Sequence, residues 1–124
     1  MPSEFVKEVA DVFAKDGPLS KVTANYTPRP SQIEFATSVA EALEKGKTLV
    51  AEAGTGTGKT FAYLVPALLK DQKVLISTAG KTLQDQLFTK DIPALLKALG
   101  MGCRVALLKG RSNYICKQRL EHAL

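Results

Sequence analysis

The sequence predicts an α/β fold with a parallel sheet, and two observations support this prediction. From residue 47 onward, short apolar segments alternate with segments that have the apolar spacing of helices. Strands that alternate with helices indicate parallel strands joined by right-handed crossovers. The second observation is a glycine-rich loop between the first apolar segment and the helix expected after it.

The expected strands are short apolar runs, the pattern typical of buried strands. They occupy residues 47–53, 73–78 and 103–110. Apolar residues at helical spacing predict helices within residues 3–17, 31–46, 59–70, 81–100 and 113–124. Residues 18–30 are rich in proline and predict a connector without regular structure. Proline is expected to kink two of the helices, at Pro66 and near Pro93.

The composition is that of a soluble globular protein, with 45% hydrophobic and 23% charged residues. No apolar run approaches the ~20 residues that a membrane span needs. The N-terminal segment carries acids where a signal peptide would have a basic region. Two cysteines, Cys103 and Cys116, do not make a disulfide framework. We therefore expect a cytoplasmic protein with no membrane partner.

The net charge of +5 is concentrated near the C-terminus. Residues 101–124 hold five bases and one acid, Glu121. A basic end is typical of a protein that binds a polyanion such as nucleic acid. A solvated charged face explains the same charges, and charge alone leaves both interpretations open.

The glycine-rich loop has the sequence AGTGTGKT, from Ala53 to Thr60. Glycines let the backbone adopt positive φ and approach a ligand closely. Main-chain amides and the start of a helix then form an anion site. The segment matches G-x-x-x-x-G-K-[ST] except that Ala53 replaces the first glycine. It predicts a phosphate-binding loop for ATP or GTP.

Two residues of this loop have expected catalytic roles. Lys59 is expected to reach the β- and γ-phosphates, and Thr60 to offer its hydroxyl to Mg²⁺. The residues expected to contact the triphosphate are Gly54, Thr55, Gly56, Thr57, Gly58, Lys59 and Thr60.

Upstream of the loop, YTPRPSQ places Tyr26, Arg29 and Gln32 at three-residue spacing before a helix. A glutamine amide has the donor and acceptor needed to recognise an adenine edge, and a tyrosine ring can stack on it. A surface turn followed by a helix cap explains the same residues, so the spacing alone does not decide.

Two segments downstream suit contacts to a nucleic acid backbone. In VLISTAGKTLQDQL, Thr78 ends an expected strand and Gln84 lies on the following helix. An ordinary solvated helix is the alternative interpretation. LLKGRSNYIC joins an expected strand to a basic loop with Arg111, an aromatic residue and Cys116.

Together these segments resemble a known family. AGTGTGKT resembles motif I of superfamily 2 helicases, RPSQ the Q-motif, and STAGKTLQDQL motif Ia. LLKGRSNYIC is similar to the approach to the first cluster cysteine of the XPD-related iron–sulfur helicases, in particular the DinG-like group with its YoaA branch. The resemblance covers about residues 26–119.

The resemblance implies a fold and an activity. It implies a partial RecA-like P-loop NTPase domain beginning at residue 25, after an N-terminal helix and connector at residues 1–24. It also implies an ATP-dependent DNA helicase with 5′→3′ polarity, active in DNA repair, with single-stranded DNA as the substrate class. ATP, Mg²⁺ and a four-iron–four-sulfur cluster are the implied cofactors, the cluster only in a longer parent protein.

The resemblance also implies roles for individual residues. Arg29 and Gln32 would help bind adenine, while Thr78, Gln84 and Arg111 would lie near DNA. Cys116 would be the first cluster ligand, whereas Cys103 matches no ligand position. We expect the chain to be the opening part of the motor domain, because no apolar strand ending in Asp-Glu follows Thr60.

Two other classes of protein remain open. One is a different phosphate-loop enzyme, such as a small kinase, although no arginine-rich lid is evident before residue 101. The other is a stand-alone nucleotide- or DNA-binding module without catalysis. If the chain is part of a helicase, we expect this fragment by itself to be inactive.

Overall fold

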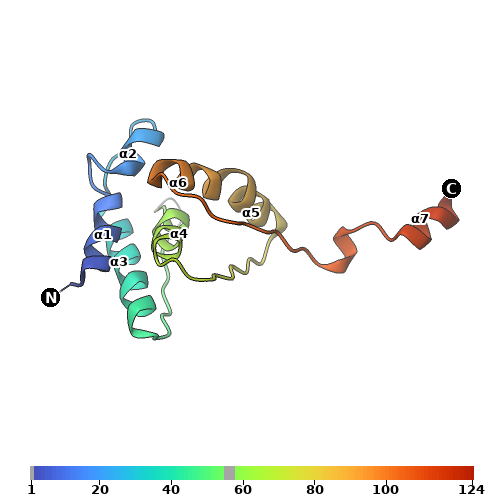
Figure 1. Cartoon of the computed structure of the whole chain (residues 1–124), viewed down its shortest axis with the longest axis horizontal. Helices are drawn as coiled ribbons and strands as arrows, with labels where there is room; N and C mark the ends of the chain where they lie inside the picture. The colour runs from blue at the N-terminus through green and yellow to red at the C-terminus, as the bar shows by residue number, and fades with distance from the viewer. Residues whose placement is uncertain (1, 55–57) are drawn as a thin grey trace.

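The computed structural model describes residues 2–54 and 58–124, and the regular elements in these residues are all helical. Figure 1 shows several helices packed together and a C-terminal segment that runs away from them. In chain order the elements are α1 (Glu4–Val12), α2 (Pro18–Val22), α3 (Pro30–Lys45), α4 (Lys59–Leu69), α5 (Lys81–Gln86), a π-helical turn η1 (Leu87–Asp91), α6 (Ile92–Leu99), a 3₁₀ turn η2 (Arg111–Asn113) and α7 (Lys117–Ala123).

The expected α/β fold with a parallel, RecA-like sheet is wrong for the described part of the chain. Residues 47–53, 73–78 and 103–110 were expected as strands, but no described residue of these segments belongs to a strand. Several of their apolar side chains face solvent: Val50 and Leu75 are each 94% exposed and Leu108 is 83% exposed, whereas Ile76 packs against the core. A strand needs a second segment to complete its hydrogen bonds, whereas a helix completes them within itself. The apolar runs therefore do not become strands, because here they have no paired neighbour.

The five expected helices are confirmed, and their ends follow local signals. Ser3 caps α1 by accepting a hydrogen bond from the amide of Val6 at 3.2 Å. Gly46 and Gly100 end α3 and α6 in the left-handed conformation that glycine adopts without strain. The connector expected at residues 18–30 contains one further short helix, α2, which begins at Pro18. Proline suits the first helical position because its missing N–H has no partner there in any case.

The disturbance expected near Pro93 takes the form of η1. The helical chain continues from α5 to α6 through this wider turn. Pro93 has no N–H to donate to the residue four positions earlier, and a π-helical turn accommodates the missing hydrogen bond. Pro66 lies inside α4, where the chain remains helical.

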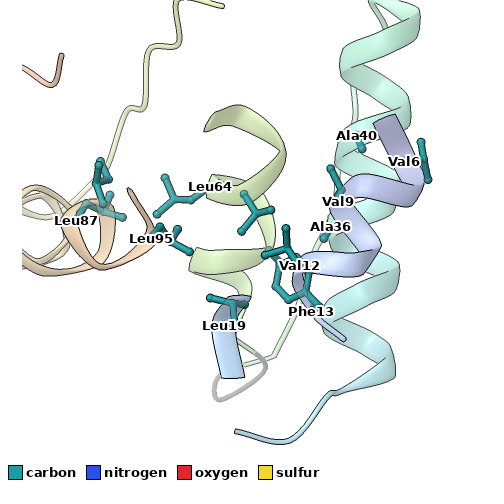
Figure 2. Close-up of a cluster of buried hydrophobic side chains, with 13 residues drawn as sticks. Val6, Val9, Val12, Phe13, Leu19, Ala36, Ala40, Leu64, Leu87 and Leu95 are labelled. Atoms are coloured by element: carbon teal, nitrogen blue, oxygen red, sulfur yellow. The ribbon is translucent and has the colours of Figure 1, made fainter. Parts of the chain in front are cut away.

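The hydrophobic core joins α1, α2, α3, α4, η1 and α6 (Figure 2). Helix α3 packs on α1 and α4, and α2 packs on α6. The side chains buried most completely include Phe13, Leu19, Leu64 and Leu95. The packing of α3 against α4 positions the candidate site, because these two helices carry its central residues.

Candidate nucleotide-binding site

The site is built around a hydrogen bond between α3 and the start of α4. Gln32 lies in the first turn of α3 and is only 6% exposed. Its Nε2 donates to the main-chain carbonyl of Gly58 at 3.0 Å. Gly58 is the N-cap residue of α4. The upstream glutamine and the glycine-rich loop, separated by 26 residues, are thus brought together.

Gly58 is required by its backbone conformation and by its neighbour. Its φ of +71° lies in the left-handed region that side chains disfavour. A Cβ at this position would also collide with the side-chain amide of Gln32. The last glycine of the loop therefore allows both the turn into α4 and the close approach of Gln32.

Lys59 and Thr60 are the first two residues of α4. The Lys59 ammonium donates to the carbonyl of Ala53 at 3.1 Å, so this exposed side chain reaches back to the residue before Gly54. No side chain caps the N-terminus of α4. The start of α4 therefore offers main-chain N–H groups and the partial positive charge of the helix dipole to an anion.

Tyr63 lies one turn after Thr60 in α4. Burial raises the pKa of Tyr63 above its ordinary value of 10.0, and the neighbouring Thr60 side chain partly offsets this rise. The phenol of Tyr63 therefore stays protonated at neutral pH. Thr55, Gly56 and Thr57 lie outside the described residues, and Gly54 is exposed.

The residues before α3 have clear places in the structure. Arg29 is exposed and occupies the N-cap position of α3, three residues before Gln32. The Tyr26 hydroxyl donates to the carbonyl of Phe13 at 2.7 Å. Burial raises the pKa of Tyr26, so its hydroxyl remains a donor. Tyr26 thereby fastens the connector to the end of α1.

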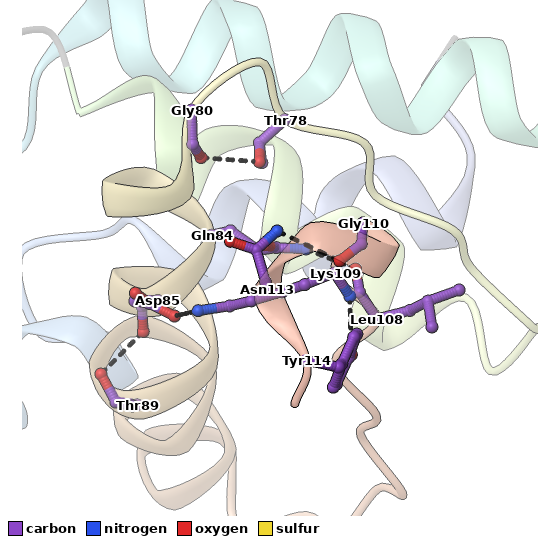
Figure 3. Close-up of polar contacts among 10 residues, drawn as sticks. All are labelled: Thr78, Gly80, Gln84, Asp85, Thr89, Leu108, Lys109, Gly110, Asn113 and Tyr114. Atoms are coloured by element: carbon purple, nitrogen blue, oxygen red, sulfur yellow. Dashed lines mark hydrogen bonds and ion pairs between the residues drawn. The ribbon is translucent and has the colours of Figure 1, made fainter. Parts of the chain in front are cut away.

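The residues expected near DNA lie on a second part of the structure (Figure 3). The Thr78 hydroxyl donates to the carbonyl of Gly80, just before α5. Gln84 lies on α5, and its Nε2 donates to the carbonyl of Leu108 at 2.8 Å. Arg111 is exposed at the start of η2. Gln84 and the segment that carries Arg111 are therefore brought together by a direct contact.

Sequence reasoning missed the ion pair beside this contact. The Lys109 ammonium lies 2.8 Å from the Asp85 carboxylate. These residues are 24 positions apart, and several other acids and bases could pair equally well on sequence alone. The sequence offers only weak signals for this ion pair. The two residues have opposite charges, and they directly follow Gln84 and Leu108 in the chain.

A comparison with protein families decides the affiliation of the chain. The model of the DEAD/DEAH box helicase family matches residues 32–123. The matched range begins at Gln32, includes Lys59 and Thr60, and ends in α7. The chain belongs to the DEAD/DEAH box helicase family.

Three curated relatives place this DEAD/DEAH box chain more narrowly. It is 56% identical to the ATP-dependent DNA helicase YoaA of Escherichia coli over 91% of its length, and 48% identical to YoaA of Haemophilus influenzae over 98%. It is 45% identical to the ATP-dependent helicase DinG of Mycobacterium tuberculosis over 79%. The matched parts make up 18%, 19% and 16% of these relatives, so the chain spans less than a fifth of their length. No solved structure matches the chain.

Both cysteines of this DEAD/DEAH box chain are exposed free thiols. Cys116 is the N-cap residue of α7, and Cys103 lies in the irregular segment before η2. Among the described residues no three His, Cys, Asp or Glu side chains gather in a metal-binding arrangement. A four-iron–four-sulfur cluster takes four ligands, so these residues by themselves do not fit one.

In the described part of this DEAD/DEAH box chain, no helix combines the length and the apolar character that crossing a bilayer needs.

Proposed function

We propose that this chain supplies the nucleotide-binding loop of an ATP-dependent DNA helicase. One observation carries the proposal: Gly58, Lys59 and Thr60 begin α4 in a chain 56% identical to a relative named as such a helicase. In this proposal residues 25–124 begin the ATP-binding domain, and residues 1–24 form a preceding helix and connector.

The loop would hold the triphosphate through its backbone and two side chains. Main-chain amides from Gly54 to Thr60, with Thr55, Gly56 and Thr57 between them, would face the phosphate oxygens. Lys59 would exchange the carbonyl of Ala53 for the β- and γ-phosphates, since its ammonium already reaches back to the residue before Gly54. Thr60 would offer its hydroxyl oxygen to Mg²⁺ from the first turn of α4. Mg²⁺ would neutralise charge that develops on the phosphates during transfer.

Arg29 and Gln32 would help bind adenine. The Nε2 of Gln32 donates to Gly58, which leaves Oε1 as the atom able to accept from the adenine amino group. Gln32 would thereby connect recognition of the base to the shape of the phosphate loop. This arrangement favours ATP over GTP, because guanine carries a carbonyl oxygen at the corresponding position.

The DNA-facing residues would be Thr78, Gln84 and Arg111. Arg111 is exposed and belongs to a C-terminal segment with five bases and one acid, which suits a phosphate backbone. The substrate would be single-stranded DNA in a repair reaction, and the polarity 5′→3′, as the resemblance to iron–sulfur helicases implies. The protein would act in the cytoplasm.

Cys116 would be the first of four cysteine ligands to a four-iron–four-sulfur cluster in the full-length protein. Its place before α7 is exposed, and residues beyond this chain would have to supply the other ligands. Iron content of the purified full-length protein tests this. Cys116→Ser should lower the iron content, whereas Cys103→Ser should leave it unchanged. Equal iron content in both variants would remove Cys116 from the ligand set.

The helicase proposal is tested by DNA-stimulated ATP hydrolysis of the full-length protein. Lys59→Ala should lower the turnover rate by roughly 10²-fold or more, because a positioned charge at the phosphates is lost. Lys7→Ala removes an equal charge from the exposed face of α1 and should have no effect. Hydrolysis that survives Lys59→Ala would reject the proposed loop as the nucleotide site.

A further inference from the structure

Residues 108 and 109 are held against α5 at two consecutive positions (Figure 3). The Gln84 amide donates to the carbonyl of Leu108, and one residue later the Lys109 ammonium pairs with Asp85 at 2.8 Å. Two neighbouring residues of one helix thus contact two neighbouring residues of a segment that is irregular. We call this pair of contacts the α5 clasp.

The loop that follows the clasp is fixed by its own hydrogen bonds. The amide of Lys109 donates to the hydroxyl of Tyr114 at 2.9 Å. The backbone and side-chain nitrogens of Asn113 both donate to the carbonyl of Gly110, at 2.9 and 3.2 Å. Arg111 therefore projects from a small closed turn, and the clasp attaches this turn to α5.

The clasp is also the main attachment of the C-terminal segment. Among the described residues, no other hydrogen bond or ion pair joins positions 102–124 to α1–α6. Every residue from 111 to 124 is exposed. The direction in which the basic residues of this segment point therefore depends on Gln84 and Asp85.

The Lys109 side chain differs from the other bases of the segment. It is 24% exposed and its charge is paired with Asp85, whereas Arg104, Arg111, Lys117 and Arg119 are exposed. The charge of Lys109 thus serves an internal contact, and those of the other four remain turned to solvent.

We propose that Asp85 and Gln84 are positioning residues, which clasp Leu108 and Lys109 so that Arg111 and the basic residues after it are presented to a single-stranded nucleic acid backbone. This inference rests on the proposed function, because it assigns residues that orient the DNA-binding segment. Neither residue needs to touch the nucleic acid to act in this way.

The sign of a mutational effect separates positioning from simple charge. Asp85→Ala raises the net charge from +5 to +6, so electrostatics alone would tighten binding to DNA. Loss of the clasp would weaken it, because the basic segment would lose its orientation. Glu41→Ala is the matched control, since it adds the same charge at an exposed position on α3.

The experiment uses this chain and a fluorescein-labelled oligothymidylate, with anisotropy as the readout. Asp85→Ala should weaken binding by about two- to fivefold, the range expected for a partly exposed ion pair. Glu41→Ala should leave binding unchanged or tighten it slightly. Combining Asp85→Lys with Lys109→Asp keeps the net charge and reverses the pair, and it should restore binding toward the wild-type value. Binding by Asp85→Ala as tight as that of Glu41→Ala would overturn the proposal.

Hydrogen exchange tests the clasp without DNA. The amide of Lys109 should exchange faster in Asp85→Ala and in Gln84→Ala than in the wild type, and return toward wild-type protection in the charge reversal. Unchanged exchange in both single variants would show that the clasp does not hold the segment, which overturns the inference whatever the chain binds. If the exchange changes as expected but the wild-type chain does not bind the oligonucleotide, the clasp stands and the proposed role toward DNA is rejected.

Discussion

The side-chain amide of Gln32 on α3 donates to the carbonyl of Gly58, the N-cap residue of α4, at a distance of 3.0 Å. This single contact joins the first turn of one helix to the glycine that begins the next. Gln32 is buried, so its amide has little water available as an alternative partner. The position of Gly58 therefore depends on a residue 26 positions earlier in the sequence.

Gln32→Ala should lower the free energy of unfolding by about 1–3 kcal/mol, because a buried hydrogen bond is lost. It should also weaken the binding of a fluorescent ATP analogue, since the loop is no longer held at Gly58. Urea unfolding and fluorescence titration measure the two effects. Thr37→Ala is the control on the same helix, because its hydroxyl bonds only to main-chain carbonyls of α3. Equal nucleotide affinity in both variants would contradict a role of Gln32 in the loop.

Gly58→Ala should lower the free energy of unfolding more than Gly46→Ala does. Both glycines have positive φ, +71° and +61°, and alanine in this conformation costs about 1 kcal/mol. An added Cβ meets nothing at Gly46 but collides with Gln32 at Gly58. We expect a loss of about 2–3 kcal/mol at Gly58, which includes the displaced hydrogen bond.

A double variant separates the two contributions at Gly58. With Gln32→Ala already present, Gly58→Ala should cost less than it does alone, because the collision is gone. Urea unfolding of the two single variants and the double variant gives the coupling. Strict additivity would show that Gln32 and Gly58 do not interact as described.

Leu64 and Leu75 test the helical arrangement of the chain. Leu64 on α4 is 1% exposed, so Leu64→Ala should cost about 2–5 kcal/mol. Leu75 is 94% exposed in the irregular segment after α4, so Leu75→Ala should change stability by no more than about 0.5 kcal/mol. Thermal or urea unfolding measures both. A large loss at Leu75 would show that this segment is buried and not solvent-facing.

The contrast between these leucines also explains which parts of the fold could be predicted from sequence. The helices were predictable because their signals are local: Ser3 caps α1, and Gly46 and Gly100 end α3 and α6. A strand depends on a partner elsewhere in the chain, which an apolar run such as 73–78 does not identify. The predicted sheet is therefore wrong for the described part of the chain.

The candidate site also combines residues that the sequence identifies with contacts that it does not. The loop from Gly54 to Thr60 was predicted from its spacing, whereas Gln32 was singled out only by the resemblance of RPSQ to the Q-motif. The contact of Gln32 with Gly58, and those of α5 with Leu108 and Lys109, could not be found. They depend on helix packing and on atoms 24 to 26 residues apart.

Asp91 should make stability depend on acidic pH. Burial raises its pKa above the ordinary 3.8, and the hydrogen bond from Gln86 partly offsets the rise. The folded state therefore binds the proton more tightly than the unfolded state. The stabilisation that comes from this tighter proton binding at Asp91 is fully present below pH 3.8. It is lost as pH rises through the raised pKa of the folded state.

The measurement is urea unfolding at several values of pH for the wild type and Asp91→Asn. The difference in unfolding free energy, wild type minus variant, should fall across this acidic window and be constant above it. Gln86→Ala should extend the window to higher pH, because the bond that lowers the pKa is gone. A constant difference at every pH would contradict a raised pKa for Asp91.

Arg111 should contribute one phosphate contact, and salt dependence can count it. For single-stranded DNA, the logarithm of the binding constant falls with the logarithm of salt concentration by about 0.7 for each phosphate neutralised. Arg111→Ala should therefore weaken binding of a labelled oligothymidylate and make the slope shallower by about 0.7. Lys15→Ala removes the same charge from an exposed position between α1 and α2 and should leave the slope unchanged. Equal slopes for the wild type and Arg111→Ala would place Arg111 outside the DNA interface. If Arg111 contacted a phosphate, its loss would reduce the number of counterions released on binding and the slope would change.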